Sequence, residues 1–302
     1  MTHTARTITA VDFCGPVEGQ LVAMVPGAMR PARPFDGLTE RVRATWTAGD
    51  FGRIAVGFAE GAAAFVARHC EDPGPRVLDV ACGTGNLAIP AARRGARVTG
   101  LDIAPNLLVA ARAAAEEAGV PARFDEGDAE DLPYAAGSFD IVLSMFGVMF
   151  APHPDVAMSE MFRVAAPGGR IALANWTPRG FIGSMLRAHT SRVPPPPGVP
   201  SVLDWGDEET LRRRLAPFTG GIRAVHMEPR TITLAYPLPP AGVVELFQQW
   251  YGPSVRTFAA LDADGRASLS ADLLGLWSAH NTAAPGATAV DAEYLDVRID
   301  LV

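Results

Sequence analysis

The segment that most restricts the fold of this chain is residues 76–86, RVLDVACGTGN. A short apolar run containing one acid, Asp79, leads directly into a Cys-Gly-Thr-Gly turn, and a helical pattern follows. This order predicts a buried parallel strand, a tight glycine turn and the start of a helix. Gly83 and Gly85 lack a Cβ, so the backbone of the turn can approach a ligand closely. The free N–H groups of the turn can then bind negative or polar groups of that ligand.

Alternation of strand and helix continues beyond this turn at nearly even spacing. The predicted strands are residues 76–80, 98–102, 122–126, 139–144, 170–176, 222–228 and 294–299. Helical patterns separate the first five of them. Such a series predicts an α/β fold with a Rossmann-like, doubly wound, mostly parallel seven-stranded sheet, covered by helices on both faces.

Further helical patterns follow the fifth strand and separate the last two strands. We interpret residues 178–221 and 237–285 as helical cap elements over the ligand-binding edge of the sheet. We also expect Asp155 to cap the helix before the fifth strand, and the Gly168-Gly169 pair to end that helix.

The N-terminal region has a different character from the rest of the chain. Residues 1–40 contain proline and glycine breakers without a clear period, which predicts an irregular arm ahead of one domain over residues 41–302. Asp50 is expected to cap a helix. The apolar face of that helix is predicted to be Ile54, Phe58, Ala62 and Phe65. The segment 46–58 is placed either to fold over a ligand at the glycine turn or simply to pack on the sheet.

Composition excludes several classes of function. A hydrophobic content of 48% over 302 residues supports a substantial core, and the net charge of −7 argues against a protein that mainly binds nucleic acid. All 26 basic residues are arginine, which excludes lysine Schiff-base chemistry and a P-loop lysine. Cys14, Cys70 and Cys82 are too few and too scattered for a disulfide framework or a zinc site, so no metal is expected.

No membrane-spanning or export pattern is evident in the sequence. The N-terminus lacks an apolar stretch behind a basic start, which argues against a signal peptide. The longest apolar stretch, near residues 142–151, is shorter than the roughly 18 residues that a transmembrane helix needs. We therefore expect a cytoplasmic protein that does not act at a membrane.

Polar residues collect at the predicted carboxyl ends of the strands. Gly83, Asp102, Asp128 and Ser144 each end or follow one of the predicted strands. Because ligands of doubly wound sheets bind outside the carboxyl ends, these positions predict one shared binding site.

Four segments in this order resemble the class I S-adenosylmethionine-dependent methyltransferases. They are VLDVACGTGN (77–86), VTGLDIAPNLL (98–108), GDAEDLPYAAGSFDIVLSMFG (127–147) and EMFRVAAPGGRIALANW (160–176). The resemblance is nearest to the branch that includes quinone-biosynthesis and natural-product methyltransferases, and it covers residues 46–176 well. It implies S-adenosylmethionine as cofactor and a small-molecule acceptor in secondary or specialised metabolism.

The resemblance also implies roles for individual residues. Asp79 and the backbone of residues 83–85 face the methionine end of the cofactor, and Asp102 accepts hydrogen bonds from both ribose hydroxyls. Asp128 accepts from the adenine amino group. The full predicted cofactor-binding set is Asp79, Ala81, Gly83, Thr84, Gly85, Asp102, Ile103, Asp128, Ala129, Ser144 and Met145. The alternatives are that Asp102 is an ordinary strand-end acid, that Asp128 is a turn or helix cap, and that Asp79 pairs with loop amides.

A dinucleotide-binding enzyme of the NAD type is the rival interpretation of the same turn. Residues 83–88 satisfy G-x-G-x-x-A, and Asp102 lies near the expected distance downstream. However, an acid inside the first strand and the element Gly127-Asp128-Ala129 do not belong to that fingerprint. These two features favour the methyltransferase.

Methyl transfer needs an acceptor atom held in line with the methyl–sulfur bond in a water-poor pocket, and proximity can supply much of the acceleration. His153, in the loop after the fourth strand, is the candidate general base, and its alternative is a loop histidine bonded to its surroundings. The residues predicted to line the acceptor pocket are Phe146, Met149, Trp250 and Tyr251. Simple packing is the alternative for each of them.

Three further questions stay open at this point. A tRNA or rRNA methyltransferase is the second hypothesis, which the acidic balance disfavours. The third is a protein that binds the cofactor without transferring its methyl group. The N-terminal arm could support a homodimer.

Overall fold

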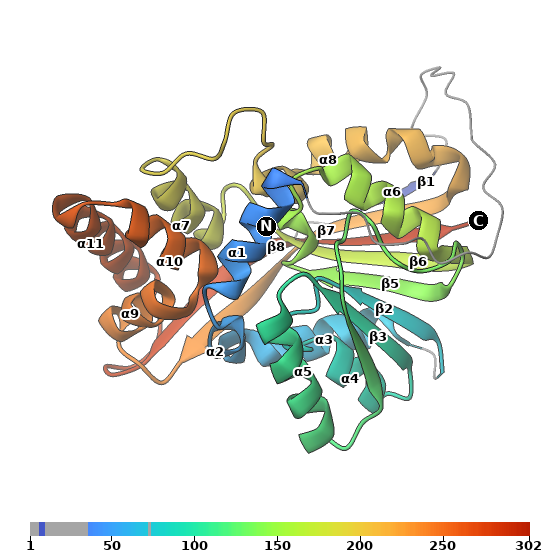
Figure 1. The fold of residues 1–302 in the computed structure, drawn as a ribbon, viewed down its shortest axis with the longest axis horizontal. Coiled ribbons are helices and arrows are strands. Elements are labelled where there is room, and N and C mark those ends of the chain that lie inside the picture. Colours follow the sequence, from blue (N-terminus) through green and yellow to red (C-terminus); the bar gives the residue numbers. More distant parts are fainter. Residues whose placement is uncertain (1–5, 10–35, 72–73) are drawn as a thin grey trace.

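The computed structural model describes residues 6–9, 36–71 and 74–302 (Figure 1). Most of the predicted N-terminal arm therefore lies outside the described residues. Two described elements fall inside residues 1–40 and correct the expectation of an irregular segment there: strand β1, Arg6–Thr9, and the start of helix α1, Gly37–Thr47.

Within the described residues, the sheet has eight strands in the order β1-β7-β8-β6-β5-β2-β3-β4. The five strands from β4 to β6 are parallel, and β8, β7 and β1 complete the sheet in antiparallel fashion. The strands after β1 are β2 Arg76–Val80, β3 Arg97–Asp102, β4 Ala122–Glu126, β5 Phe139–Met145, β6 Ala165–Trp176, β7 Ile222–Tyr236 and β8 Thr288–Leu301. All seven predicted strands are confirmed, and β1 is an eighth at the edge.

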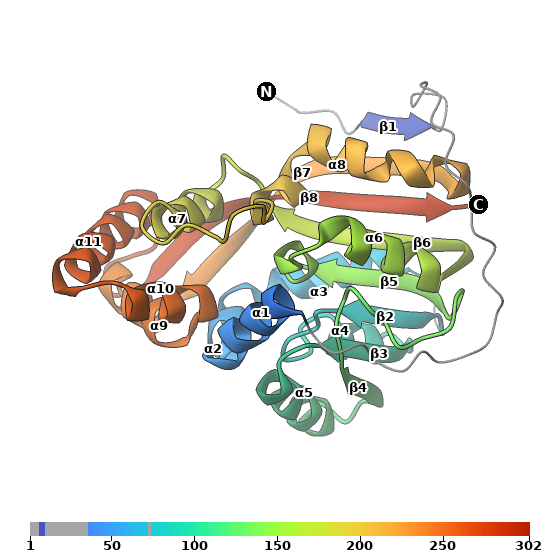
Figure 2. The same cartoon turned by 45° about the horizontal axis from the view of Figure 1, so that its top comes forward.

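Helices cover both faces of this sheet. Helices α6 and α8 lie on one face, and α3 lies behind the sheet on the other (Figure 2). The helices of the sheet region are α2 Phe51–Ala55, α3 Ala59–His69, α4 Ala88–Arg93, α5 Pro105–Glu117, α6 Pro154–Val164 and α8 Glu208–Leu215. The predicted cap of α2 is confirmed, since the Asp50 carboxylate accepts from the Gly52 N–H. The four residues of the predicted apolar face, Ile54, Phe58, Ala62 and Phe65, are buried, but the prediction of a single helix was wrong. Ile54 lies in α2, Phe58 ends a 3-10 turn over Val56–Phe58, and Ala62 and Phe65 lie in α3.

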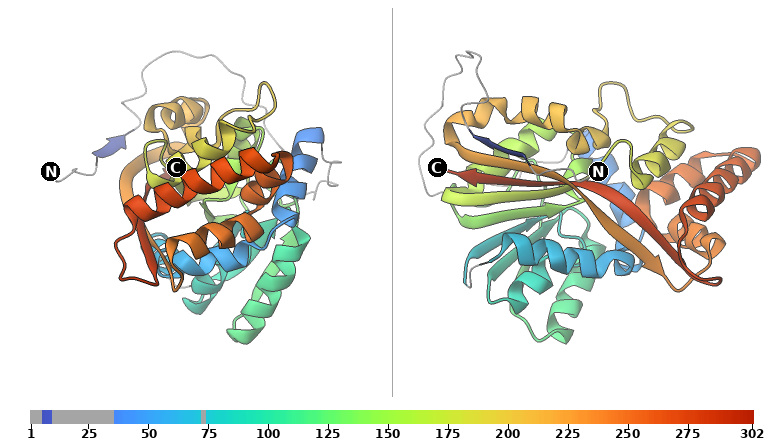
Figure 3. Two further views of the ribbon diagram at one scale, coloured as in Figure 1. Left: turned by 90° about the vertical axis from the view of Figure 1, so that its left-hand side faces the viewer. Right: turned by 180° about the vertical axis from the view of Figure 1, so that it is seen from behind.

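Strands β7 and β8 are about twice as long as predicted. Their outer halves extend past the rest of the sheet, and a group of helices packs there (Figure 3). These helices are α7 Phe181–Thr190, α9 Pro240–Trp250, α10 Gly252–Ala260 and α11 Ala263–His280. The prediction ended β7 at residue 228, and Pro229, which has no N–H to donate, lies just beyond that point. In the structure Pro229 pairs with Leu295 beyond the end of β1, where that side of β7 has no described neighbour strand.

Two predicted helix boundaries were wrong. Helix α6 begins at Pro154 with His153 at the N-cap position, and Asp155 lies in the first turn instead of capping it. The helix ends at Val164, so Gly168 and Gly169 lie within β6. A proline is favoured at the first helical position, and with Pro154 there the helix starts two residues earlier than an Asp155 cap would place it.

Within the described residues, no helix combines the length and the apolar composition that crossing a bilayer requires.

Candidate functional site

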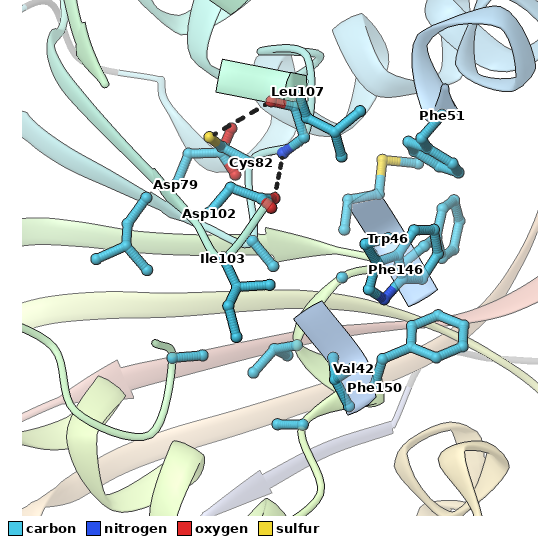
Figure 4. A pocket seen from close by; sticks show the side chains of 18 of the residues that line it. Val42, Trp46, Phe51, Asp79, Cys82, Asp102, Ile103, Leu107, Phe146 and Phe150 are labelled. Carbon is cyan, nitrogen blue, oxygen red and sulfur yellow. Dashed lines mark hydrogen bonds between the residues drawn. The ribbon is translucent and has the colours of Figure 1, made fainter. Parts of the chain in front are cut away.

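A cleft opens at the carboxyl ends of β2, β3 and β5, where Gly83, Asp102 and Met145 form part of its wall (Figure 4). Its volume is about 890 Å³, including the open space at its mouth. One side is made by strand-end acids and the glycine turn, and the other by aromatic residues of α1 and α2. We refer to this space as the strand-end cleft.

Asp102, the last residue of β3, is fixed by two backbone N–H groups. Its Oδ2 accepts from Gly83 N at 2.7 Å and its Oδ1 from Ala104 N at 2.9 Å. The carboxylate lines the cleft and is 6% exposed, and this burial raises its pKa to about 6. Each oxygen keeps a second lone pair, so the group can accept further hydrogen bonds from a ligand.

Asp79 and Asp128 add two more carboxyl groups to the cleft wall. Asp79 is 1% exposed, and its Oδ2 accepts from Ala88 N at 3.1 Å, at the start of α4. Burial, with a smaller contribution from the nearby charge of Asp102, raises the pKa of Asp79 to about 8. The Asp128 carboxylate accepts from Glu130 N, and burial raises its pKa to about 6. Asp79 thus pairs with a backbone amide and also borders the cleft.

The glycine turn contributes one of its two glycines to the cleft. Gly83 has φ +55°, and a Cβ built there would lie 3.6 Å from the Phe51 ring, in the space between the two walls. Gly85 has φ +87°, but a Cβ there would contact Ile89 and Phe124 at 3.3–3.4 Å. Gly83 therefore keeps the cleft open, whereas Gly85 allows close packing behind the turn.

Not every predicted cofactor-binding residue reaches the cleft. Ala81, Ile103, Ala129 and Met145 lie in its wall, whereas Thr84 and Gly85 do not. Thr84 lies beside Gly52 of α2.

Ser144 departs from its prediction because it is turned away from the cleft. It is fully buried, donates to the Val80 carbonyl at 2.7 Å and accepts from Val148 N at 3.1 Å. Its hydroxyl therefore links β5 to β2 instead of lining the cleft.

The chain takes a left-handed turn directly after β5. Phe146 has φ +60° and Ala81 has φ +56°, and both border the cleft. Gly147 touches Ala81 so closely that an added Cβ would lie 2.6 Å from the Ala81 Cβ. A non-glycine residue with a left-handed backbone conformation costs energy, and such residues are concentrated at functional sites.

A second hollow of about 360 Å³ continues from the strand-end cleft; we call it the inner chamber. It shares five wall residues with the cleft: Trp46, Phe51, Phe58, Phe146 and Phe150. Its other wall residues are Ile54, Trp176, Ile182, Met185, Leu234, Phe247 and Tyr251. The Trp46 ring lies at the junction, near Phe51 and Phe150 (Figure 4). It is edge-on to Phe51, Phe150 and Tyr251, with centroid separations of 4.9–5.9 Å.

The predicted acceptor-pocket residues divide into two groups. Phe146 and Tyr251 line the inner chamber. Met149 is 1% exposed and packs in the core, which agrees with the alternative of simple packing for this residue. Trp250 borders neither space, and the Arg53 guanidinium lies 4.2 Å from its ring centroid.

The geometry does not support His153 as a general base. Its side chain lies in neither the cleft nor the inner chamber, and Nδ1 is 2.7 Å from Glu130 Oε2, with Nε2 3.6 Å from Asp36 Oδ2. The hydrogen bond to Glu130 raises the pKa of the imidazole. His153 is therefore an ion-pairing residue that joins its loop to residue 130.

Several wall residues escaped the sequence analysis. Segment 46–58 supplies Trp46, Phe51 and Phe58. The sequence analysis offered ligand covering as one role for this segment, but it assigned none of the three side chains to a ligand-binding wall. Trp176 and Phe247 were assigned to a strand and a cap helix, and nothing in their local pattern distinguishes a wall residue from a core residue. Among the described residues, no group of three or more metal-ligating side chains occurs.

Comparison with known proteins gives sequence and fold relatives. A family model for a methyltransferase domain matches residues 77–169. An uncharacterized protein of Mycobacterium tuberculosis is 37% identical over 221 residues, covering 72% of this chain and 80% of that protein. The demethylmenaquinone methyltransferase of Thermus thermophilus is 42% identical over 124 residues, covering 40% of this chain and 56% of that enzyme.

Two solved structures share the fold at low identity. The YcgJ protein of Bacillus subtilis has a TM-score of 0.50 at 18% identity, covering 80% of this chain and 98% of that one. A Haemonchus contortus phosphoethanolamine N-methyltransferase, solved with S-adenosylhomocysteine, also has a TM-score of 0.50 at 18% identity. It covers 80% of this chain and 52% of that one.

Proposed function

The chain belongs to the class I S-adenosylmethionine-dependent methyltransferases, and on this basis we propose that it methylates a small molecule held in the inner chamber. The observation that supports the small-molecule assignment is the inner chamber itself. It shares five wall residues with the strand-end cleft, and its wall is built from aromatic and aliphatic side chains, which suits the apolar body of a small acceptor. A role in secondary or specialised metabolism belongs to the same proposal.

The strand-end cleft fits the cofactor chemically. Three carboxyl groups, those of Asp79, Asp102 and Asp128, line it, and its described wall holds no Lys, Arg or His side chain. S-adenosylmethionine contains a sulfonium and an ammonium group, which this acidic wall would stabilise. The absence of a Cβ at Gly83 leaves room between the turn and Phe51 for such a ligand.

Individual residues would then hold separate parts of the cofactor. Two backbone amides fix the Asp102 carboxylate, and its two oxygens can accept further hydrogen bonds, which suits the two hydroxyls of a ribose. Asp79 and the turn at Gly83 would bind the methionine end. Asp128 and the Ala129 N–H would bind the adenine.

When bound, S-adenosylmethionine supplies an electrophilic methyl group on its sulfonium. The aromatic walls at Trp46 and Phe146 would exclude water and hold the acceptor in line for displacement at that methyl group. The described wall of the inner chamber holds no carboxylate, imidazole or amine, so it supplies no strong base.

One experiment tests the proposal against two alternatives, an RNA methyltransferase and a protein that binds the cofactor without transferring its methyl group. Purified protein is incubated with radiolabelled S-adenosylmethionine and either a panel of small hydroxylated aromatics or bulk tRNA and rRNA. Label in a small aromatic supports the proposal, whereas label in RNA identifies the alternative substrate class. Tight cofactor binding without transfer to any acceptor would support a non-methylating role.

A further inference from the structure

The walls of the inner chamber are almost entirely apolar. Eight of its twelve wall residues are aromatic, and the other four are aliphatic or methionine. The polar side-chain atoms in this wall are the indole N–H groups of Trp46 and Trp176 and the hydroxyl of Tyr251. An acceptor bound here therefore buries a largely apolar body and meets few hydrogen-bonding groups.

The chain has four tyrosines, and the hydroxyl of Tyr251 differs from the other three in its hydrogen bonding. The hydroxyl of Tyr134 donates to Asp125, that of Tyr236 to the Ile54 carbonyl, and that of Tyr294 accepts from Arg68. Within the described residues, the Tyr251 hydroxyl makes no hydrogen bond. A tyrosine hydroxyl that is buried usually has a partner, so this one is left for a ligand.

The position of Tyr251 supports that assignment. The residue follows α9 at its C-terminal end and is 4% exposed, so bulk water does not readily satisfy its hydroxyl. Its ring is held at 5.9 Å from Trp46 and 5.4 Å from Phe247. Burial raises the pKa of the phenol, so the group remains a hydrogen-bond donor at neutral pH.

We propose that Tyr251 is a positioning residue for the acceptor, and that its hydroxyl donates a hydrogen bond to an oxygen of a flat, hydroxylated aromatic molecule in the inner chamber. The aromatic walls bind the ring faces, and the single hydroxyl fixes the orientation of the ring. This proposal rests on the proposed function, since it concerns the acceptor side of that site.

The test is a binding series on the protein saturated with S-adenosylhomocysteine. Isothermal titration compares 1-naphthol with naphthalene, which share a two-ring body and differ only in the hydroxyl group. We expect 1-naphthol to bind about tenfold more tightly than naphthalene, because a net hydrogen bond is worth about that factor.

The variant Tyr251→Phe removes the hydroxyl and keeps the ring. It should abolish the preference for 1-naphthol while changing the affinity for naphthalene less than twofold. The matched control is Tyr134→Phe, whose hydroxyl bonds to Asp125 and which borders neither space, so the preference should persist there.

Three results overturn the proposal: a preference below twofold in the unmodified protein, a preference that survives in Tyr251→Phe, or no binding of any probe. The first and third are measured on the unmodified protein, so they do not depend on whether the variant folds. If S-adenosylhomocysteine itself fails to bind, the proposed function fails first. If it binds and the probes show no dependence on Tyr251, the positioning role alone is rejected.

Discussion

The rings of Phe146 and Trp176 stack face to face, with centroids 3.5 Å apart and planes inclined by 9°. Phe146 follows β5 with a left-handed backbone, and Trp176 ends the neighbouring strand β6. The stack forms part of the wall of the inner chamber, and Phe146 also borders the strand-end cleft. The turn after β5 therefore places one ring between the two spaces.

Replacing that ring should affect the acceptor more than the cofactor. Phe146→Ala should lower the free energy of unfolding by about 3 kcal/mol or more, because it removes a buried aromatic side chain. Acceptor KM should rise at least tenfold, while affinity for S-adenosylhomocysteine changes only a few-fold. Phe162→Ala is the matched control, since Phe162 stacks on Phe218 at 4.2 Å and borders neither space. Equal losses of acceptor binding in both variants would contradict the prediction.

Asp102 should dominate cofactor affinity among the acids of the cleft. Asp102→Ala is expected to weaken S-adenosylhomocysteine binding at least tenfold in isothermal titration, because charge-assisted hydrogen bonds contribute about 1.5–3 kcal/mol. Asp140→Asn is the control, because Asp140 pairs with Arg76 near the opposite end of the strands. Unchanged affinity in Asp102→Ala would remove that residue from the cofactor site.

Cofactor affinity should rise with pH between about 5 and 7. Burial raises the pKa of Asp102 and of Asp128 to about 6, so both acids are partly protonated at the lower end of this range. The cationic cofactor binds more tightly when these two acids are ionised. Binding at low pH therefore releases protons from them, and the affinity increases as the pH rises. Titrations in buffers of different ionisation enthalpy measure that release. The pH dependence should be smaller in Asp102→Asn, and an equal dependence would contradict this assignment.

Asp79 should make the protein without cofactor less stable as the pH rises. Its pKa is raised from 3.8 to about 8 in the folded state, so folded protein binds the proton more tightly than unfolded chain. The free energy of unfolding should therefore fall between about pH 4 and pH 8, by up to about 1.4 kcal/mol per pH unit. Asp79→Asn keeps an oxygen for the Ala88 N–H and should flatten this decline. Thermal unfolding of the unmodified protein and of Asp79→Asn across this pH range measures the difference in their pH dependence. The same loss of stability with pH in both proteins would contradict the role of Asp79.

His153 should be dispensable for turnover. Its imidazole pairs with Glu130 and lies outside both spaces, so His153→Ala should keep methyl transfer within about twofold. The measurement is initial rate with any acceptor found in the labelling experiment, together with a circular dichroism check of folding. A folded variant that has lost transfer by more than tenfold would restore the general-base role.

The core of the fold followed from local sequence. Alternating apolar runs and helical patterns identified the strands from β2 to β6, because each such element buries one face whatever its partner. Two of the acids were identified in the same way: Asp102 ends and Asp128 follows a predicted parallel strand, and the carboxyl ends of such strands share one edge. Asp79 lies inside the first strand, and the resemblance to methyltransferases singled it out. Those residues do meet in one cleft.

Local sequence failed where a residue's role depends on distant partners. The outer halves of β7 and β8 pair with each other across more than 50 residues of intervening chain. Ser144 and Met149 have neighbours in the sequence that border the cleft, yet both side chains are buried. Ser144 lies within β5 and its hydroxyl bonds to the Val80 carbonyl, and Met149 lies in the turn after β5.

The sequence by itself determined most of the sheet, the glycine turn and the strand-end acids of the cleft, because strand period, glycine backbone freedom and strand-end position are properties of short segments. The tertiary structure decided the walls of the inner chamber. Trp46, Phe146, Trp176 and Tyr251 come from four separate parts of the chain, and no periodicity distinguishes an aromatic ring that lines a chamber from one that fills a core. The difference is whether packing leaves space beside the ring, and that space exists only after the distant segments have come together.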